Sequence, residues 1–241
     1  MDPAHLQELI DLEDTYWWHV AKRELVTRLV TRHFPAPGRL VEGGIGSCRN
    51  LLEFRALGYN VQGFDISERA VSYGRQRGLE GVRVHDLGTP WPLAPSSVTV
   101  CVMLDVLEHL ADPVQVLKHA AACLEPGGGI VFTVPAYPWL FSSWDKRLGH
   151  YRRYTRRMIV EQAADAGLGV RWLNRWNSFT LPPAIALRTL NRLRGREQAA
   201  EFPRVSSPVN WLLKTAARCE RKWLERLPLP CGLSLVGVLT R

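Results

Sequence analysis

Short apolar runs alternate with segments of helical periodicity along most of this chain. Two runs, 98–104 and 130–134, are continuous and rich in β-branched residues, a pattern typical of parallel strands buried on both faces. Between them, apolar positions over 114–124 fit a helix, and Pro126 with the glycines after it ends that helix. The repeated alternation of strand and helix predicts an α/β fold built on a mostly parallel sheet.

The same patterns extend toward both ends of the chain. Helical spacing over 5–33 predicts two N-terminal helical pieces, in which Trp17 and Trp18 are expected to be packing anchors, with a lid over a ligand cleft as the alternative. A long segment before the last strand is expected to hold two helices, the second at 209–227. Further strands are expected at 40–41, 61–65, 81–86, 167–173 and 233–239. We expect a single domain with three parts: a helical lid (1–36), a core (37–177 and 230–241) and a helical insertion (178–229).

The composition of the chain indicates in which compartment the protein is expected and which classes of partner it could bind. No apolar run reaches the roughly 18 residues that suggest a membrane span, and the N-terminus lacks the basic-then-apolar pattern of a signal peptide. The five cysteines include no C-x-x-C pair, which fits a reducing cytoplasm. The net charge of +8 leaves an acidic small molecule, a nucleic acid or an anionic membrane surface open as partners.

A glycine-rich turn follows the first predicted strand. Glu42 ends that strand, and glycines follow at 43, 44 and 46, where they allow unusual backbone angles and the close approach of a ligand. A dinucleotide site of the type G-x-G-x-x-G needs a third glycine, which Arg49 replaces, and an acid before the turn suits a cationic ligand better than a pyrophosphate. About 20 residues later, Asp65 ends the second strand, where nucleotide-binding α/β folds hold a ribose diol.

This turn resembles the first motif of class I S-adenosylmethionine (SAM) methyltransferases, acid-x-Gly-x-Gly-x-Gly, with Cys48 in place of the last glycine. The segment Leu-Asp-Val-Leu-Glu-His-Leu-Ala-Asp-Pro at 104–113, followed by a helix and Leu-Glu-Pro-Gly-Gly-Gly, looks like motifs of the type 11 group, which includes the ubiquinone-biosynthesis O-methyltransferases. The resemblance covers roughly 13–177 and 230–240. It implies a Rossmann-like seven-stranded sheet in the order 3-2-1-4-5-7-6, with an antiparallel last strand and helices on both faces. It also implies SAM as cofactor and S-adenosylhomocysteine (SAH) as its product.

The resemblance further implies which residues meet the cofactor. Glu42 would lie near the methionine ammonium, Arg23 would face the methionine carboxylate, and Asp86 would lie near the adenine amino group. The implied cofactor-binding set is Tyr16, Arg23, Glu42, Gly43, Gly44, Gly46, Asp65, Ile66, Asp86, Leu87, Leu104 and Asp105.

A methyltransferase must align its reactants, exclude water and remove a proton from a protonated nucleophile. The candidates for this base are His109, His150 and Tyr151. The spacing Asp105-x-x-Glu108-His109, with His150 in a later loop, also resembles the metal-binding set of the plant small-RNA 2′-O-methyltransferases. Whether these groups bind a divalent ion stays open. The simpler expectation is that Glu108 and His109 shape the turn without a metal.

Basic and aromatic residues crowd the loop after the fifth strand, beyond which ligands bind in open α/β sheets. Arg152 and Arg153 are expected either to bind an acidic acceptor or to pair with acids such as Asp145 and Glu161. We therefore expect methyl transfer to a small acidic or hydroxylated molecule, onto oxygen. Transfer to nitrogen or carbon of a natural product or a lipid-linked substrate is the alternative.

Two other classes remain open. One is an NAD-linked oxidoreductase, which the missing third glycine disfavours, and the other is a non-catalytic module that binds SAM or RNA. Because no RRM or KH signature appears, nucleic acid is not the expected partner. The basic helix at 209–227 is expected to pack one stripe on the core, with capping of the site, a dimer face or peripheral membrane contact as alternatives. The chain is expected to be a monomer or a homodimer.

Overall fold

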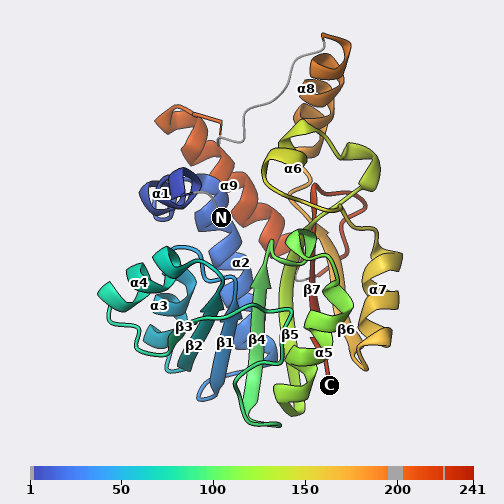
Figure 1. Ribbon diagram of the computed structural model, residues 1–241. Coiled ribbons are helices and arrows are strands. Elements are labelled where there is room, and N and C mark those ends of the chain that lie inside the picture. The colour runs from blue at the N-terminus through green and yellow to red at the C-terminus, as the bar shows by residue number, and fades with distance from the viewer. Residues whose placement is uncertain (1–2, 195–202, 225) are drawn as a thin grey trace.

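Seven strands form one sheet in the computed structural model of this protein, which describes residues 3–194, 203–224 and 226–241 (Figure 1). The strands are β1 (Arg39–Gly43), β2 (Asn60–Asp65), β3 (Val82–Val84), β4 (Val98–Leu104), β5 (Leu124–Pro135), β6 (Gly169–Trp176) and β7 (Ser234–Thr240). Their order, β3-β2-β1-β4-β5-β7-β6, confirms the predicted order. β7 runs antiparallel to both of its neighbours, as expected, and the other strand pairs are parallel.

Helices cover both faces of this sheet, as predicted. The helices are α1 (Pro3–Leu12), α2 (Trp17–His33), α3 (Arg49–Ala56), α4 (Glu68–Gln76), η1 (Leu107–His109), α5 (Pro113–Cys123), η2 (Pro138–Leu140), α6 (Ser143–Arg147), α7 (Arg156–Asp165), α8 (Leu181–Leu193) and α9 (Ser207–Leu224). Helices α2, α3, α4 and α9 supply side chains to one apolar core, and α5 and α7 supply the other. In Figure 1, α5 lies in front of the sheet and α2 behind it.

Strand β4 shows why the central apolar runs are continuous. Val100 and Val102 belong to one core, whereas Cys101 and Met103 belong to the other, and all four are fully buried. Because successive side chains of a strand point to opposite faces, a strand covered on both faces is apolar at every position. The predicted burial of this strand on both faces is confirmed.

Strand β5 corrects one expectation. It begins at Leu124, directly after α5, and runs to Pro135, so the predicted strand at 130–134 was too short: Pro126 and the glycines, expected only to end the helix, lie within the strand. Gly129 lies within β5, and a Cβ there would lie 2.1 Å from the carbonyl oxygen of Leu239 in β7. Glycine is required here because β7 approaches closely, not because the chain turns.

The two N-terminal tryptophans are packing anchors, as expected. The Trp18 ring stacks on Trp176 of β6 with a centroid distance of 4.9 Å, and the Trp17 ring lies 5.8 Å from Phe179. These contacts fix the first turn of α2 against the end of the sheet.

Helix α9 of the insertion contacts α2 through ion pairs and a hydrogen bond. The two predicted helices are present as α8 and α9, although residues 195–202 and 225 of the insertion lie outside the described residues. Arg218 and Arg221 of α9 pair with Glu24 of α2 at 2.8 and 2.6 Å. Asn210 Oδ1 accepts a hydrogen bond from the Trp17 backbone N–H at 2.8 Å. Helix α9 therefore packs one stripe on the domain, which was the expected arrangement.

The described helices were also compared with the length and hydropathy that a bilayer requires. None of them has an apolar stretch long enough to span a membrane.

Candidate functional site

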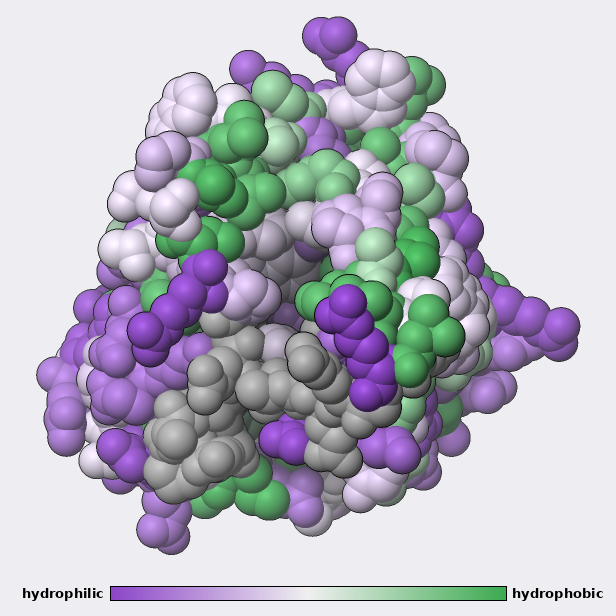
Figure 2. Space-filling model, turned by 90° about the horizontal axis from the view of Figure 1, so that it is seen from above, coloured by the Kyte–Doolittle hydropathy of each residue, from purple (hydrophilic) through white to green (hydrophobic). Residues whose placement is uncertain are grey.

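The carboxyl ends of β1, β2 and β4 meet at the glycine turn, at the end of the molecule seen in Figure 2, where the surface is hollowed near its centre. Gly44 and Gly46 have φ angles of +76° and +48°, and a Cβ on Gly44 would lie 2.6 Å from Val106. Cys48, which replaces the last glycine of the motif, also has a positive φ, +62°. The turn thus keeps the left-handed backbone of the motif, with strain at a residue that is not glycine.

The N-terminal segment lies against this turn. A Cβ on Gly46 would meet the side chain of Leu9 in α1 at 2.9 Å. Arg77 donates to the Glu13 carboxylate at 2.8 Å and to the Ser47 carbonyl at 2.9 Å, which ties the α1–α2 connection to the turn. This placement suits the proposed lid over the strand ends.

Glu42 ends β1 as a buried acid with an unused oxygen. It is 1% exposed, its Oε1 accepts from Asn50 Nδ2 at 2.8 Å, and its Oε2 has no hydrogen-bond partner among the described residues. Burial raises the pKa of Glu42 to about 8, and the charge of Lys22 offsets part of this effect. A cationic donor near Oε2 would satisfy the carboxylate and favour its ionised form.

Asp65 is held at the end of β2 by two backbone amides. Its Oδ2 accepts from Gly46 N at 3.2 Å and its Oδ1 from Ser67 N at 2.9 Å. Each carboxylate oxygen keeps a further lone pair, so the group is able to accept from the two hydroxyls of a ribose. The neighbouring Ile66 is 67% exposed at the same edge.

Three further cofactor candidates lie at the ends of neighbouring strands: Asp86 and Leu87 follow β3, and Leu104 ends β4. Asp86 is exposed and accepts from Gly88 N at 2.9 Å, whereas Leu87 is buried and its side chain packs on Gly43. Leu104, 9% exposed, ends β4.

Asp105 follows β4 with a φ of +54° and is paired on both oxygens. Its Oδ1 accepts from Thr133 Oγ1 at 3.0 Å and its Oδ2 from Lys22 Nζ at 2.7 Å. Burial raises the pKa of Asp105, but the charge and the hydrogen bonds of Lys22 and Thr133 outweigh burial and hold it below its usual range. Lys22 is a site residue that the sequence analysis missed. The sequence did contain a signal for it: Lys22 lies one helical turn after Trp18 and one before Val26, so it shares the stripe of α2 that packs on the domain.

The two N-terminal cofactor candidates have protein partners. Arg23 donates to the Glu13 carbonyl at 2.8 Å and to Asp14 Oδ1 at 3.1 Å. The Tyr16 hydroxyl donates to the Pro203 carbonyl at 3.0 Å. Their expected contacts with the cofactor stay predictions.

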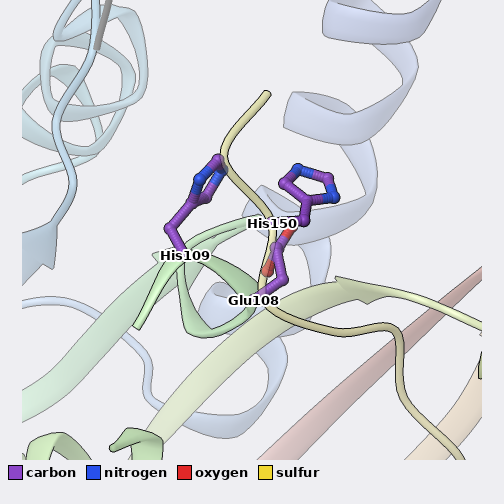
Figure 3. A group of neighbouring side chains, drawn as sticks. All are labelled: Glu108, His109 and His150. Carbon is purple, nitrogen blue, oxygen red and sulfur yellow. The ribbon is translucent and has the colours of Figure 1, made fainter. Parts of the chain in front are cut away.

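Glu108, His109 and His150 come together at η1 and the loop after α6 (Figure 3). Each offers a ligand atom within 4.8 Å of the others, and the two imidazole centroids lie 4.6 Å apart. Glu108 is fully buried, and neither of its oxygens has a hydrogen-bond partner among the described residues. Burial, together with the nearby Asp105, raises the pKa of Glu108 well above its usual value. Desolvation and the neighbouring His150 lower the pKa of His109 to about 4.

Asp145 fixes the orientation of His150. Its Oδ1 lies 3.1 Å from His150 Nδ1 and accepts from Arg153 Nε at 2.7 Å. Although burial raises the pKa of Asp145, the hydrogen bond from His150 and the charge of Arg153 hold it far below its usual range. With Nδ1 bound to a carboxylate, Nε2 of His150 is the nitrogen left to act on a ligand.

The loop arginines resolve an alternative that the sequence left open. Arg153 is 4% exposed and paired with Asp145, so the pairing alternative is confirmed for this residue. Arg152 donates to the carbonyls of Leu110 and Ala111 at 3.1 and 2.8 Å. Both arginines bind groups of the protein itself, but Arg152 uses a single nitrogen in these bonds, so its binding of an acidic acceptor stays a prediction.

Tyr151 lies apart from the buried groups of this cluster. Its backbone N–H donates to the Glu108 carbonyl at 2.8 Å, but its side chain is 63% exposed, with the Arg152 guanidinium 5.9 Å from the ring centroid. Of the three candidate bases, the structure therefore brings two, His109 and His150, into contact.

Comparison with known proteins fits this geometry. The profile of a methyltransferase domain family matches residues 16–172. The ubiquinone biosynthesis O-methyltransferase of Bordetella pertussis is 32% identical over 100 residues, which are 39% of this chain and 42% of that protein. The chain thus matches less than half the length of this relative.

Solved structures share the fold across nearly the whole chain. An S-adenosylmethionine-dependent methyltransferase from Mesorhizobium loti has a TM-score of 0.62 at 15% identity, covering 92% of this chain and 98% of the other. The methyltransferase in a Haloferax volcanii complex with the activator Trm112 has a TM-score of 0.64 at 20% identity, covering 99% and 94%.

Proposed function

This chain belongs to the methyltransferase-domain family of class I SAM-dependent enzymes, and we propose that it methylates an oxygen atom of a small hydroxylated molecule. The observation that carries this proposal is His150, whose Nδ1 lies 3.1 Å from Asp145 Oδ1 and which clusters with Glu108 and His109 of η1, just after β4. The name of the Bordetella pertussis relative supports transfer to oxygen.

The residues at the strand ends fit the cofactor. When bound, SAM supplies a methyl group on a sulfonium whose leaving group is a neutral thioether. Asp65 would accept from the ribose hydroxyls, Glu42 Oε2 would accept from the methionine ammonium, and the turn at Gly44 and Gly46 would let the cofactor approach the backbone. These are carboxylates at the places where the cofactor carries hydroxyls and positive charge.

His150 acts as the base in this proposal. Asp145 accepts from Nδ1–H, so Nε2 carries the lone pair that takes the proton of the acceptor hydroxyl. Bound SAM would supply the methyl group to the acceptor oxygen freed of its proton in this way, and SAH would be the product. His109, whose pKa is lowered to about 4, stays neutral beside His150 and adds no competing charge.

The test follows tritiated methyl from SAM into a panel that holds 3,4-dihydroxybenzoate, simple phenols and matched amines. We expect label in an O-methyl group, loss of transfer in His150→Ala, and unchanged SAH affinity in that variant because His150 is not placed on the cofactor. Label found solely on amine nitrogen or on carbon would overturn the assignment to oxygen. Full activity in His150→Ala would overturn the assignment of the base.

The Glu108, His109 and His150 cluster also fits a divalent cation. A fully buried carboxylate with two unpartnered oxygens is suited to a metal, and an Asp145-bound imidazole is the usual arrangement of a metal-ligating histidine. Asp105, expected as a fourth ligand, is instead bound to Lys22 and Thr133. A cation held here would supply Lewis acidity toward the acceptor hydroxyl.

Calorimetric titration with Mn²⁺ separates these two versions of the site. Binding to the wild-type chain that is lost in Glu108→Gln supports the metal. Equal heats in both proteins, with transfer that survives EDTA, support His150 acting alone.

We also propose that the acceptor carries an apolar portion. Among the described residues of α8 and α9, seven large apolar side chains are exposed: Leu187, Leu190, Leu193, Val209, Trp211, Leu212 and Trp223. Figure 2 shows apolar side chains on both sides of the hollow. A catechol with an alkyl chain should then have a lower KM than 3,4-dihydroxybenzoate. An equal or higher KM for the alkyl catechol would contradict an apolar portion of the acceptor but would leave the proposal of methyl transfer to oxygen unchanged.

A further inference from the structure

Lys22 places an ammonium group at the carboxyl ends of β1 and β4. Its Nζ lies 2.7 Å from Asp105 Oδ2 and 5.9 Å from the centroid of the Trp18 ring, and its side chain is 15% exposed. Lysine side chains are rarely this buried, because the ammonium is strongly hydrated and must be paired when water is removed. A lysine that is so largely withdrawn from water therefore needs a reason at this position.

The groups around Lys22 are carboxylates. Burial raises the pKa of Glu42 at the end of β1 and of Glu108 in η1, and the charge of Lys22 offsets part of that rise; at Asp105 it helps to hold the pKa below its usual range. The ammonium thus lies among acids contributed by two strands and the turn after β4. Asp105 is its one hydrogen-bond acceptor among the described residues, and an ammonium has three N–H groups.

This charge distribution matches the methionine part of the cofactor except at one point. The carboxylates suit the sulfonium and the α-ammonium, but they repel the α-carboxylate of the same molecule. A cation among the acids is needed to offset that repulsion. Lys22 supplies it, with N–H groups to spare beyond the one bound to Asp105.

Arg23, the next residue, is occupied elsewhere. Its guanidinium donates to the Glu13 carbonyl and to Asp14 Oδ1, and Arg49 donates to that same Asp14 oxygen at 2.8 Å. Arg23 is therefore part of a network that joins the α1–α2 connection to α3. To bind a cofactor carboxylate it would have to give up these hydrogen bonds.

We propose that Lys22, and not Arg23, binds the α-carboxylate of the SAM methionine. The inference rests on the assignment of SAM as cofactor and is independent of the acceptor. Lys22 keeps its contact with Asp105, which Thr133 holds in place, and donates a further N–H to the cofactor. Asp105 is then the residue that positions the ammonium.

The experiment compares two ligands that differ in that one group. SAH and decarboxylated SAH, 5′-(3-aminopropylthio)-5′-deoxyadenosine, are titrated calorimetrically into wild type, Lys22→Met and the matched control Arg23→Met. We expect Lys22→Met to weaken SAH by about 10- to 100-fold, as for a lost charge-assisted hydrogen bond, and to leave the decarboxylated ligand unchanged. Arg23→Met should leave the ratio of the two affinities at its wild-type value.

Each other outcome has a distinct meaning. Equal weakening of both ligands in Lys22→Met would overturn the proposal and reduce Lys22 to a support for Asp105. A change of the ratio in Arg23→Met alone would restore Arg23 as the carboxylate ligand. Wild-type protein that binds neither ligand would instead overturn the cofactor assignment.

A conservative variant covers the case in which Lys22→Met does not fold. Lys22→Arg keeps the charge but replaces a compact ammonium by a planar fork. It should shift SAH affinity and leave the decarboxylated ligand unchanged. The same affinity ratio as wild type in Lys22→Arg, together with a melting temperature equal to wild type, would count against a direct contact.

Discussion

Glu42 is an acid whose surroundings favour its neutral form. One oxygen accepts from Asn50, the other has no hydrogen-bond partner among the described residues, and burial raises its pKa to about 8. A ligand ammonium near the free oxygen favours the ionised form. Cofactor binding should therefore be coupled to the release of a proton from this residue.

This coupling predicts a pH-dependent affinity for SAH. Below pH 8 the free protein holds a proton on Glu42 that binding must remove, so affinity should rise with pH, by at most about tenfold per unit, and level off above pH 8. Calorimetry at pH 6, 7, 8 and 9 measures the slope. Glu42→Gln, which cannot ionise, should show a flat profile over this range. A flat profile in the wild type would contradict the coupling.

Arg153 and Asp145 form the most buried ion pair at the site, with exposures of 4% and 0%. Because removing one partner leaves an uncompensated buried charge, Arg153→Met should lower the free energy of unfolding by roughly 3–5 kcal/mol. Arg152→Met, which loses two hydrogen bonds to carbonyl groups, should lower it by about 1–2 kcal/mol. Urea denaturation gives both values. If Arg153→Met were as stable as wild type but had a raised KM for the acceptor, Arg153 would be a substrate-binding residue and not a structural one.

At the scale of elements, α2 carries Lys22 and depends on α9 for its position. The helix begins after Tyr16, whose side chain does not cap it, and Asn210 of α9 accepts from the Trp17 N–H instead. Asn210 also donates to the Thr15 carbonyl at 2.9 Å. The cap that α2 lacks locally is thus supplied by a residue far away in the sequence.

Asn210→Ala should therefore act as the loss of a helix cap. We expect a loss of about 1–2 kcal/mol in the free energy of unfolding, and weaker SAH binding because Lys22 is carried by the same helix. Asn210→Asp keeps the acceptor oxygen and should retain most of the stability. If Asn210→Ala unfolds at the same urea concentration as wild type, the hydrogen bonds of Asn210 contribute nothing to the stability of the fold.

The same elements show what the sequence could and could not predict. Periodicity and the resemblance were sufficient for the sheet order, for two helices in the insertion and for carboxylates at the ends of β1 and β2. The sequence patterns failed to predict features that depend on contacts between residues far apart in the chain. Glycine is required at position 129 of β5 because β7 approaches it, and Lys22 meets Asp105 because the first turns of α2 lie beside the carboxyl ends of the strands. Neither partner is near in the chain, so local patterns carry no signal of the contact.

At the scale of the whole molecule, the strand-end site joins parts that are separate in the sequence. Lys22 comes from α2, Glu42 and Asp65 from β1 and β2, and Asp105 from the end of β4. A ligand that contacts all of them links the N-terminal helices to the sheet. Binding should therefore stabilise the whole fold and not a single loop.

Thermal unfolding with two nucleotides tests this statement and the NAD alternative together. SAH at about 100 times its Kd should raise the melting temperature by roughly 5–10 °C, since ligand linkage is worth about 2.7 kcal/mol and each kcal/mol shifts a domain of this size by about 2–4 °C. NAD at the same concentration should leave it unchanged, because the Glu42 carboxylate disfavours a pyrophosphate beside the turn and Arg49 replaces the third glycine of a dinucleotide motif. Asp65→Ala, which loses the ribose acceptor, should abolish the SAH shift and serves as the control. Stabilisation by NAD and not by SAH would mean that these strand ends hold a different nucleotide, and the roles given to Glu42 and Lys22 would fall with the cofactor.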